Sequence, residues 1–379
     1  MMLSSFSYHE FRDSDREWCL SPTTFGPVTL IVGKNSAGKT RLLNVLHGLS
    51  MLMSGRIDAA YSSGTYEAAF INGAEILKYQ VELKDQAVIH EVLRVGRSVR
   101  LNRDEKKGVN SIYMASLSSK GLIDFEIPRN KLAVSAKRDK KQHPFLEILG
   151  EWADGVELQR FNSLPGGFIQ GVVLGVSPDF QPENLLRQGA PGREAIALVI
   201  LAAIAKSESK FKEGVVADMT AIGYPITDVG VGVSSVARMS PPPLAAWVKE
   251  SDLRSTTEHS SMSNGMFRAF ATIVRLNVIK IADVPTLLLI DDVGEGMDYV
   301  RSVKLISLIF DHAKKSKLQT IMTSNDRFVM NAVPLRHWGV VLRDGHNVNI
   351  LNYQNSKQEM DGFERLGLNN FDYFASKHN

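Results

Sequence analysis

Hydrophobic residues follow two different spacings along this chain. Residues 28–32 (VTLIV) and 286–290 (TLLLI) are short runs of mostly apolar positions, which is typical of strands buried on both faces of a parallel sheet. Residues 40–49 (TRLLNVLHGL) and 266–281 instead repeat their apolar positions at helical spacing. This alternation predicts an α/β fold.

Weaker patterns fill the rest of the chain. Residues 79–83 and 88–93 have the pattern of short alternating strands, within a strand-rich region over about 66–130. The other predicted elements are a helix over 144–160, two helices over about 182–222, a loop at 239–243 (MSPPP), and a hairpin of 339–342 and 348–351 around Asp344-Gly345.

A glycine-rich loop lies between the first apolar run and the helix that follows it. Its sequence at 33–40, GKNSAGKT, fits G-x-x-x-x-G-K-[ST] in a strand–loop–helix context, the pattern of a nucleoside triphosphate site. Loop N–H groups and the helix N-terminus attract phosphate oxygens. We expect Lys39 to reach the β- and γ-phosphates of ATP and the Thr40 hydroxyl to bind Mg²⁺. The other expected ligand contacts are Gly33, Asn35, Ser36, Ala37 and Gly38.

Two acids follow the second apolar run directly. A Mg²⁺–phosphate site needs a carboxylate at the end of a buried strand, and we assign Asp291 to that role. Asp292 then occupies the position of a base that orients the attacking water. About 250 residues separate Lys39 from Asp291, which is too many for a compact GTPase-like fold. We therefore predict two lobes joined into one sheet.

These motifs resemble those of ABC-type ATPase heads. Residues 291–298 (DDVGEGMD) are similar to the Walker B and D-loop stretch, and residues 262–268 (MSNGMFR) resemble the signature motif. The S-x-G-x-x-R form and the asparagine in GKNSAGKT are those of the RecF/SMC/OLD-like branch. Residues 319–326 (QTIMTSND) are similar to the strand that ends in the switch residue.

The resemblance implies a head that dimerises around ATP. Ser263 and Gly265 of one protomer would face the γ-phosphate held by Lys39 of the other, and Asp298 of the D-loop would contact the nucleotide. A serine hydroxyl and glycine amides at a helix start form an anion site in their own right. Ser263 is also a suitable N-cap for the helix over 266–281, and both roles are compatible.

Two positions depart from the family pattern. Asp292 replaces the catalytic glutamate, and its shorter side chain changes the position of the carboxylate. Asn325 replaces the switch histidine and cannot accept a proton. Glu295 lies in the D-loop, where it is poorly placed to serve as the base. These departures predict ATP binding with slow hydrolysis.

Composition narrows the remaining function classes. The net charge of +3 is too small to indicate a nucleic-acid-binding protein, and the single cysteine excludes a disulfide scaffold and a cysteine-rich zinc site. DNA binding remains possible through two basic clusters. One cluster comprises Arg94, Arg97, Arg100, Arg103, Lys106 and Lys107, and the other Lys137, Arg138, Lys140 and Lys141. No membrane segment or signal peptide is expected, which favours a cytoplasmic protein.

The motif order sets the expected domain boundaries. Residues 1–160 and 285–379 would form the ATPase lobe, with a mixed central sheet and an antiparallel β layer, and residues 161–284 a second, helical lobe. OLD-type proteins carry a nuclease domain after the ATPase, but residues 346–379 are too few for one. The histidines show no metal-ligand spacing.

The leading hypothesis is an ATP-dependent switch that dimerises head to head and controls a separate effector protein. By resemblance, its setting would be DNA repair or bacterial defence against phage. The alternative is a nearly inactive nucleotide-binding scaffold that assembles an effector complex. A transporter subunit fits less well, because the gap between Lys39 and Asp291 is too long.

Overall fold

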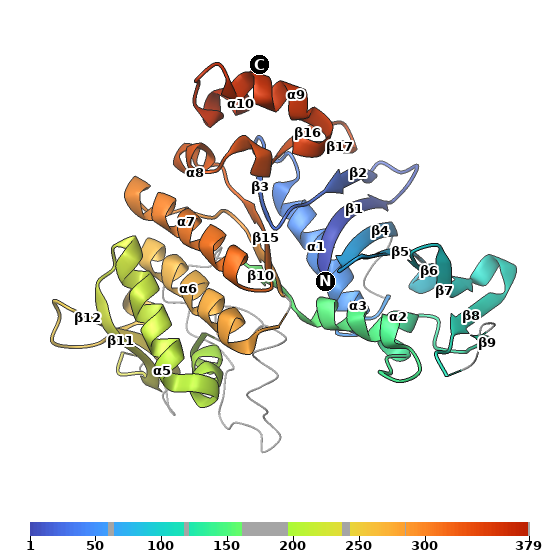
Figure 1. Cartoon of the computed structure of the whole chain (residues 1–379), viewed down its shortest axis with the longest axis horizontal. Coiled ribbons are helices and arrows are strands. Elements are labelled where there is room, and N and C mark those ends of the chain that lie inside the picture. The colour runs from blue at the N-terminus through green and yellow to red at the C-terminus, as the bar shows by residue number, and fades with distance from the viewer. Residues whose placement is uncertain (60–63, 117–120, 161–195, 237–242, 285, 378–379) are drawn as a thin grey trace.

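A single large sheet organises the protein. The computed structural model describes residues 1–59, 64–116, 121–160, 196–236, 243–284 and 286–377. Fourteen described strands pair in the order β10-β14-β15-β3-β16-β17-β2-β1-β4-β5-β6-β7-β8-β9 (Figure 1). Neighbours in this order come from distant parts of the chain, so the two ends of the sequence share one sheet.

The strands from β10 to β16 are parallel. They are β10 (Val156–Gln159), β14 (Thr286–Ile290), β15 (Leu318–Thr323), β3 (Val28–Val32) and β16 (Trp338–Asp344). In β14, Leu288 and Ile290 belong to one hydrophobic core, whereas Leu287 and Leu289 belong to another on the opposite face. The continuous apolar run is explained by this burial on both faces.

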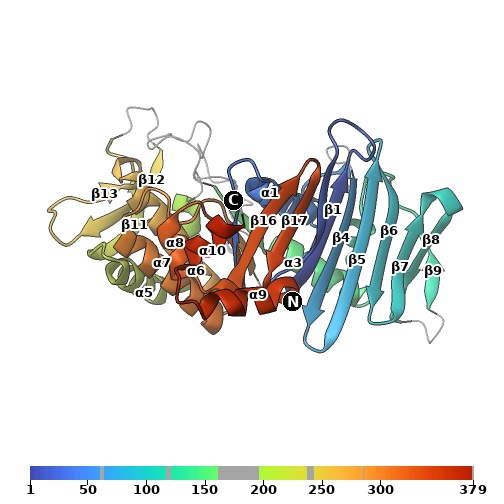
Figure 2. The ribbon, with the colours of Figure 1, turned by 90° about the horizontal axis from the view of Figure 1, so that it is seen from above.

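An antiparallel layer extends the sheet beyond β17 (Asn347–Asn352). Its strands are β1 (Met2–Glu10), β2 (Trp18–Thr24), β4 (Gly64–Asn72), β5 (Glu75–Lys84), β6 (Ala87–Val95), β7 (Ser98–Asp104), β8 (Val109–Tyr113) and β9 (Leu122–Asp124). Figure 2 shows these strands facing the viewer, with α1 (Lys39–Met53) and α3 (Pro144–Asp154) behind them. The strand-rich region predicted from the sequence is confirmed.

Helices cover the other face of the parallel strands. They are α5 (Ile196–Ile222), α6 (Asn264–Ala282), α7 (Tyr299–Lys315) and α8 (Arg327–Ala332), with α9 (Tyr353–Glu364) and α10 (Asn370–Ser376) towards the C-terminus. A short helix, α2 (Ala133–Ala136), precedes α3. A second sheet of β11 (Ile226–Val233), β12 (Leu244–Glu250) and β13 (Thr257–Glu258) lies beside α5 (Figure 1). None of the described helices is long and apolar enough to cross a membrane.

One predicted helix is wrong in its second half. The helix expected over 144–160 ends at Asp154, and residues Val156–Gln159 form β10 instead. Val156 pairs with Leu287 and Gln159 with Ile290, so pairing with β14 determines the conformation of this segment. This strand has a direct consequence for the site, because its last residues reach the end of β14.

Other predictions are tested only in part. The hairpin of β16 and β17 and the helix over 266–281 are confirmed. α5 contains a break at Ser207, while residues 182–195 of the predicted helical pair and 239–242 of the predicted loop lie outside the described residues. The boundaries at residues 160 and 284 remain predictions.

Candidate functional site

The glycine-rich loop joins β3 to α1 in a tight turn. Ser36 and Gly38 have φ angles of 62° and 113°, and the left-handed region favours glycine at the second of these positions. A Cβ at Gly33 would lie 3.0 Å from the Cβ of Val341 on β16. The glycines therefore allow the loop to turn and to pack closely against the neighbouring strand.

Lys39 is the first residue of α1 and extends back into the loop. Its ammonium donates to the carbonyl oxygens of Gly33 at 2.7 Å and Lys34 at 3.1 Å. Burial lowers the pKa of Lys39, while the charges of Asp292 and Asp291 oppose that shift. A buried ammonium held by carbonyl oxygens can exchange them for the anionic oxygens of a phosphate.

Thr40 and Asp291 meet although they lie 251 residues apart in the chain. The Thr40 hydroxyl donates to Oδ1 of Asp291 at 3.1 Å, and the Thr323 hydroxyl donates to the same oxygen at 2.8 Å. Asp291 is 3% exposed, and its backbone N–H donates to the carbonyl of Gln159. A hydroxyl beside a carboxylate is an oxygen donor set that suits Mg²⁺.

Asp292 stands beside this pair in a left-handed conformation with φ of 54°. Burial raises its pKa, and the negative charges of Asp291 and Glu295 raise it further. Its N–H donates to the Thr323 hydroxyl at 2.8 Å. A carboxyl with a raised pKa can accept a proton near neutral pH more readily than an ordinary aspartate.

Asn325 links the end of β15 to the glycine-rich loop. Its side-chain amide donates to Oδ1 of Asn35 at 3.1 Å, across 290 residues of sequence. Its neighbour Ser324 donates its backbone N–H to the carbonyl of Ile31 on β3. The predicted switch position therefore contacts the predicted phosphate loop directly.

Ser263 and Gly265 lie at the start of α6, next to the turn that follows β14. The Ser263 side chain caps α6 by accepting from the N–H of Met266 at 3.2 Å. A Cβ at Gly265 would collide with the carbonyl oxygen of Gly296, so the two segments touch through their backbones. Arg268 strengthens this contact by pairing with Glu295 at 2.5 Å.

Asp298 caps the next helix, α7. Its Oδ1 accepts from the N–H of Arg301 at 3.0 Å, and its Oδ2 pairs with the guanidinium of Arg301 at 2.7 Å. The backbone hydrogen bond, with the charge of Arg301, lowers the pKa of Asp298. These contacts give Asp298 a structural role, and its contact with a nucleotide stays a prediction.

Two residues at this edge were not expected from the sequence. Thr323, at the end of β15, bonds Asp291 and the N–H of Asp292. Arg160, directly after β10, places its Nε 3.6 Å from Oδ2 of Asp291. Arg160 was missed because the sequence pattern predicted a helix over 144–160. Thr323 could have been recognised from the sequence, because it is a polar residue at the end of an apolar strand.

A cavity of about 630 Å³ opens beside the loop. It is lined by Lys34, Asn35, Ser36, Ala37, Val341, Leu342, Arg343, Gly345 and Lys377. Arg343 donates to the carbonyl of Ser36 at 3.1 Å and so attaches β16 to the loop. The volume of the cavity is within the range of small-molecule sites, and Lys34, Arg343 and Lys377 make its lining basic.

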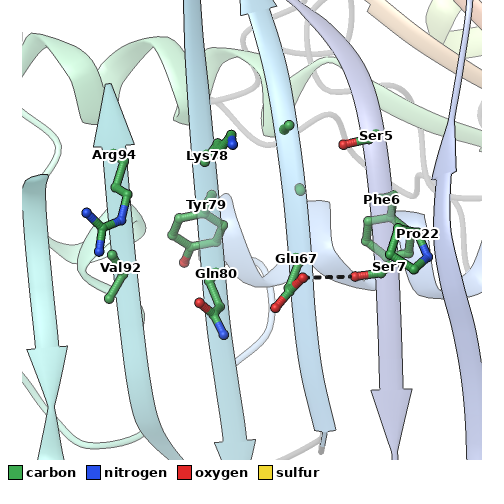
Figure 3. Close-up of a pocket in the computed structure, with 12 residues that line it drawn as sticks. Ser5, Phe6, Ser7, Pro22, Glu67, Lys78, Tyr79, Gln80, Val92 and Arg94 are labelled. Atoms are coloured by element: carbon green, nitrogen blue, oxygen red, sulfur yellow. Dashed lines mark hydrogen bonds between the residues drawn. The ribbon is translucent and has the colours of Figure 1, made fainter. Parts of the chain in front are cut away.

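The basic clusters divide into structural and exposed members. Arg103 is 5% exposed and donates to the carbonyl of Lys131 at 2.8 Å. Arg138 pairs with Glu147 and Asp154 at 3.1 and 2.8 Å. Arg94 instead lines a groove of about 300 Å³ on the antiparallel layer, where Figure 3 shows it beside Lys78. These contacts leave DNA binding a prediction.

Comparison with known proteins supports the fold. No protein family and no curated protein matches the chain in sequence. Among solved structures, the chain is similar to an SMC head bound to the C-terminal winged-helix domain of ScpA, with 11% identity, 93% of this chain and 98% of that chain covered, and a TM-score of 0.51. It is also similar to an SMC head domain with an extended coiled coil, bound to the C-terminal domain of ScpA and derived from Pyrococcus furiosus. That match has 10% identity, covers 96% of this chain and 99% of that chain, and has a TM-score of 0.51. The chain therefore has an α/β fold similar to that of SMC head domains, which is the fold class predicted from the sequence.

Proposed function

We propose that this protein is an ATP-dependent switch that binds Mg²⁺-ATP, hydrolyses it slowly and dimerises head to head around it. One observation carries the proposal: the fold brings Lys39, Thr40 and Asp291 together across about 250 residues of sequence. This places a buried ammonium, a hydroxyl and a carboxylate at the end of the same parallel strands.

Each residue has a defined role in the proposed reaction. Lys39 and the loop N–H groups hold the β- and γ-phosphates, while Thr40 and Asp291 hold the metal. Bound Mg²⁺ would neutralise charge on the phosphate oxygens. Asp292 orients the attacking water and accepts its proton, and Asn325 contributes a hydrogen bond to the phosphate or water.

The second half of the site would come from a partner protomer. Ser263 and Asn264 are exposed at the start of α6, so the Ser263 hydroxyl would suit a γ-phosphate presented by another copy. The contact between Gly265 and Gly296 would make the segment after Asp291 sensitive to that approach. ATP binding would thereby close the dimer, and hydrolysis would open it.

The direct test is ATP-dependent dimerisation. We expect light scattering coupled to size-exclusion chromatography to show a dimer with Mg²⁺ and a non-hydrolysable ATP analogue, and a monomer without nucleotide. Lys39→Ala should remain monomeric under both conditions. A monomeric wild-type protein under every nucleotide condition would contradict the proposal.

Asp292 and Asn325 also favour a second candidate, a nearly inactive scaffold that assembles an effector complex. The two candidates differ in turnover. For a working but slow ATPase, Asp292→Glu should raise steady-state hydrolysis, because the longer side chain extends the reach of the carboxylate. Absence of turnover in both forms would favour the scaffold.

The wider setting follows from resemblance. The S-x-G-x-x-R form of residues 263–268 supports the RecF/SMC/OLD-like branch, whose members lead us to propose DNA repair or defence against phage. Both similar SMC heads are bound to a domain of ScpA, and by analogy we propose a separate effector protein here.

A further inference from the structure

Arg160 lies at the predicted metal position. It follows β10 directly, and because Gln159 pairs with Ile290, Arg160 comes level with Asp291 in the sheet. The Nε atom of Arg160 lies 3.6 Å from Oδ2 of Asp291. Among the described residues, no other basic side chain comes within ion-pair distance of Asp291.

The two oxygens of Asp291 have different neighbours. Oδ1 accepts from the hydroxyls of Thr40 and Thr323, while Oδ2 faces Arg160. A carboxylate that is 3% exposed requires a compensating charge nearby. Lys39 also attracts Asp291 but donates to the loop carbonyls, whereas Arg160 is the cation that faces Oδ2.

The guanidinium of Arg160 is incompletely bonded. Its Nε and Nη2 are buried, yet neither has a hydrogen-bond partner among the described residues, and 3.6 Å is too long for a hydrogen bond to Asp291. Arg138 offers a contrast, since it bonds Asp154 at 2.8 Å and Glu147 at 3.1 Å. A cation held mainly by charge, with unused donors, is readily displaced.

We propose that Arg160 is a displaceable counter-ion of Asp291. While the metal is absent, the guanidinium balances the carboxylate. A Mg²⁺ ion held by Thr40 and Asp291 would supply that positive charge in its place and would repel Arg160. The inference rests on the proposed function, because it takes Thr40 and Asp291 as the metal ligands. It adds that metal binding is a competition against a cation of the chain itself.

Removal of this competitor should tighten metal binding. In a protein saturated with a fluorescent, non-hydrolysable ATP analogue, the affinity for Mn²⁺ as a probe can be measured by electron paramagnetic resonance. We expect Arg160→Ala and Arg160→Gln to bind Mn²⁺ about tenfold more tightly than the wild type, because both variants lack the cation that repels the metal ion. Arg160→Lys, which keeps the charge, should stay near the wild type.

Arg97→Ala is the matched control, since it removes an exposed arginine from the turn between β6 and β7. Unchanged or weaker Mn²⁺ binding in both neutral variants of Arg160 would overturn the inference. Analogue fluorescence, recorded on the same samples, reports nucleotide binding separately from metal affinity. If the wild type failed to bind the analogue, the proposed function would fall and the inference with it.

Discussion

The antiparallel layer and the ends of the parallel strands belong to one sheet, but their buried charged side chains differ in how completely they are hydrogen-bonded. In the layer, Glu91 is fully buried and accepts from the N–H groups of Ala133 and Val134 at 2.8 and 3.1 Å. The Tyr79 hydroxyl donates to it as well, at 2.9 Å. Burial raises the pKa of Glu91, and these hydrogen bonds oppose that shift. Both carboxyl oxygens are bonded, so the side chain serves to attach α2 to the sheet.

At the ends of the parallel strands, three carboxylates lie near one another, with Lys39 and Arg160 beside them. Burial raises the pKa of Asp292, and the charges of Asp291 and Glu295 raise it further. Arg160 has buried nitrogens without acceptors in the part of the chain that the structure describes. The backbone of Asp292 is left-handed. Incompletely bonded charged groups and a strained backbone in one place are typical of a functional site. A fully hydrogen-bonded cluster such as that around Glu91 is typical of a structural role.

The largest expected effect concerns the structural cluster. Glu91→Ala leaves two buried N–H groups and a tyrosine hydroxyl without an acceptor, so the free energy of unfolding should fall by about 3 kcal/mol. Urea denaturation followed by circular dichroism measures this. Affinity for an ATP analogue, per folded molecule, should stay unchanged.

Glu67→Ala is the matched control for Glu91, because Glu67 lies exposed on the solvent side of β4. Its effect on stability should stay within about 0.5 kcal/mol. Equal losses in the two variants would erase the distinction between the bonded cluster and the open surface.

A smaller loss is expected where α6 meets the turn after β14. Gly265→Ala places a Cβ against the carbonyl of Gly296, which should cost about 1–3 kcal/mol and abolish the ATP-dependent dimer. Gly362→Ala, in α9, meets nothing within 4 Å and should leave both properties intact. A normal dimer with Gly265→Ala would show that this contact is not part of the switch.

Thr323→Val tests whether the Thr323 hydroxyl holds Asp291 and Asp292 in place at the proposed metal site. The variant keeps the shape of the side chain but removes the hydroxyl that bonds Asp291 and Asp292, which should cost about 1–2 kcal/mol. Metal affinity should weaken about tenfold. Thr320→Val, in the same strand, removes a buried hydroxyl that has no hydrogen-bond partner in the described residues, so it should be neutral or stabilising. Calorimetric melting and Mn²⁺ binding compare the pair, and identical behaviour would refute the role of Thr323.

The smallest effect is a pH-dependent one at Asp292. Its folded-state pKa is raised, so its favourable contribution to stability is complete below the ordinary aspartate pKa of 3.8 and is lost as pH rises through the folded pKa. Asp292→Asn should therefore raise the melting temperature at pH 7 by about 1–2 °C, with solvent screening taken into account. The two proteins should converge in acid.

Asp298→Asn should shift the melting temperature at pH 7 in the opposite direction. The pKa of Asp298 is lowered by its hydrogen bond from the N–H of Arg301, so its contribution is present at neutral pH and is lost as pH falls through the folded pKa. This variant should melt slightly below the wild type at pH 7. Shifts of the same sign for both variants would contradict the contrast between the two carboxylates.

Local patterns in the sequence predicted much of this arrangement. The loop before Lys39 and the acids after the apolar run at 286–290 carry their chemistry in short stretches of sequence, so both were recognisable without a structure. The hairpin around Asp344-Gly345 was recognisable for the same reason, since its turn and its apolar positions are adjacent.

Features that depend on distant pairing could not be predicted in this way. β10 has only four residues and continues a helical pattern, and its pairing with β14 alone makes it a strand. Arg160 was missed for that reason. The contact of Gly265 with Gly296 likewise depends on how α6 packs after the turn, which its local sequence does not reveal.

Lys39, Thr40 and Asp291 are proposed to form an ATP site. The decisive measurement is a titration of the protein with a fluorescent ATP analogue in the presence of Mg²⁺. We predict saturable binding by the wild type and an affinity at least about a hundredfold weaker for Lys39→Ala, with circular dichroism unchanged. Equal affinity of the two proteins for the analogue would show that Lys39 does not bind the phosphates of ATP.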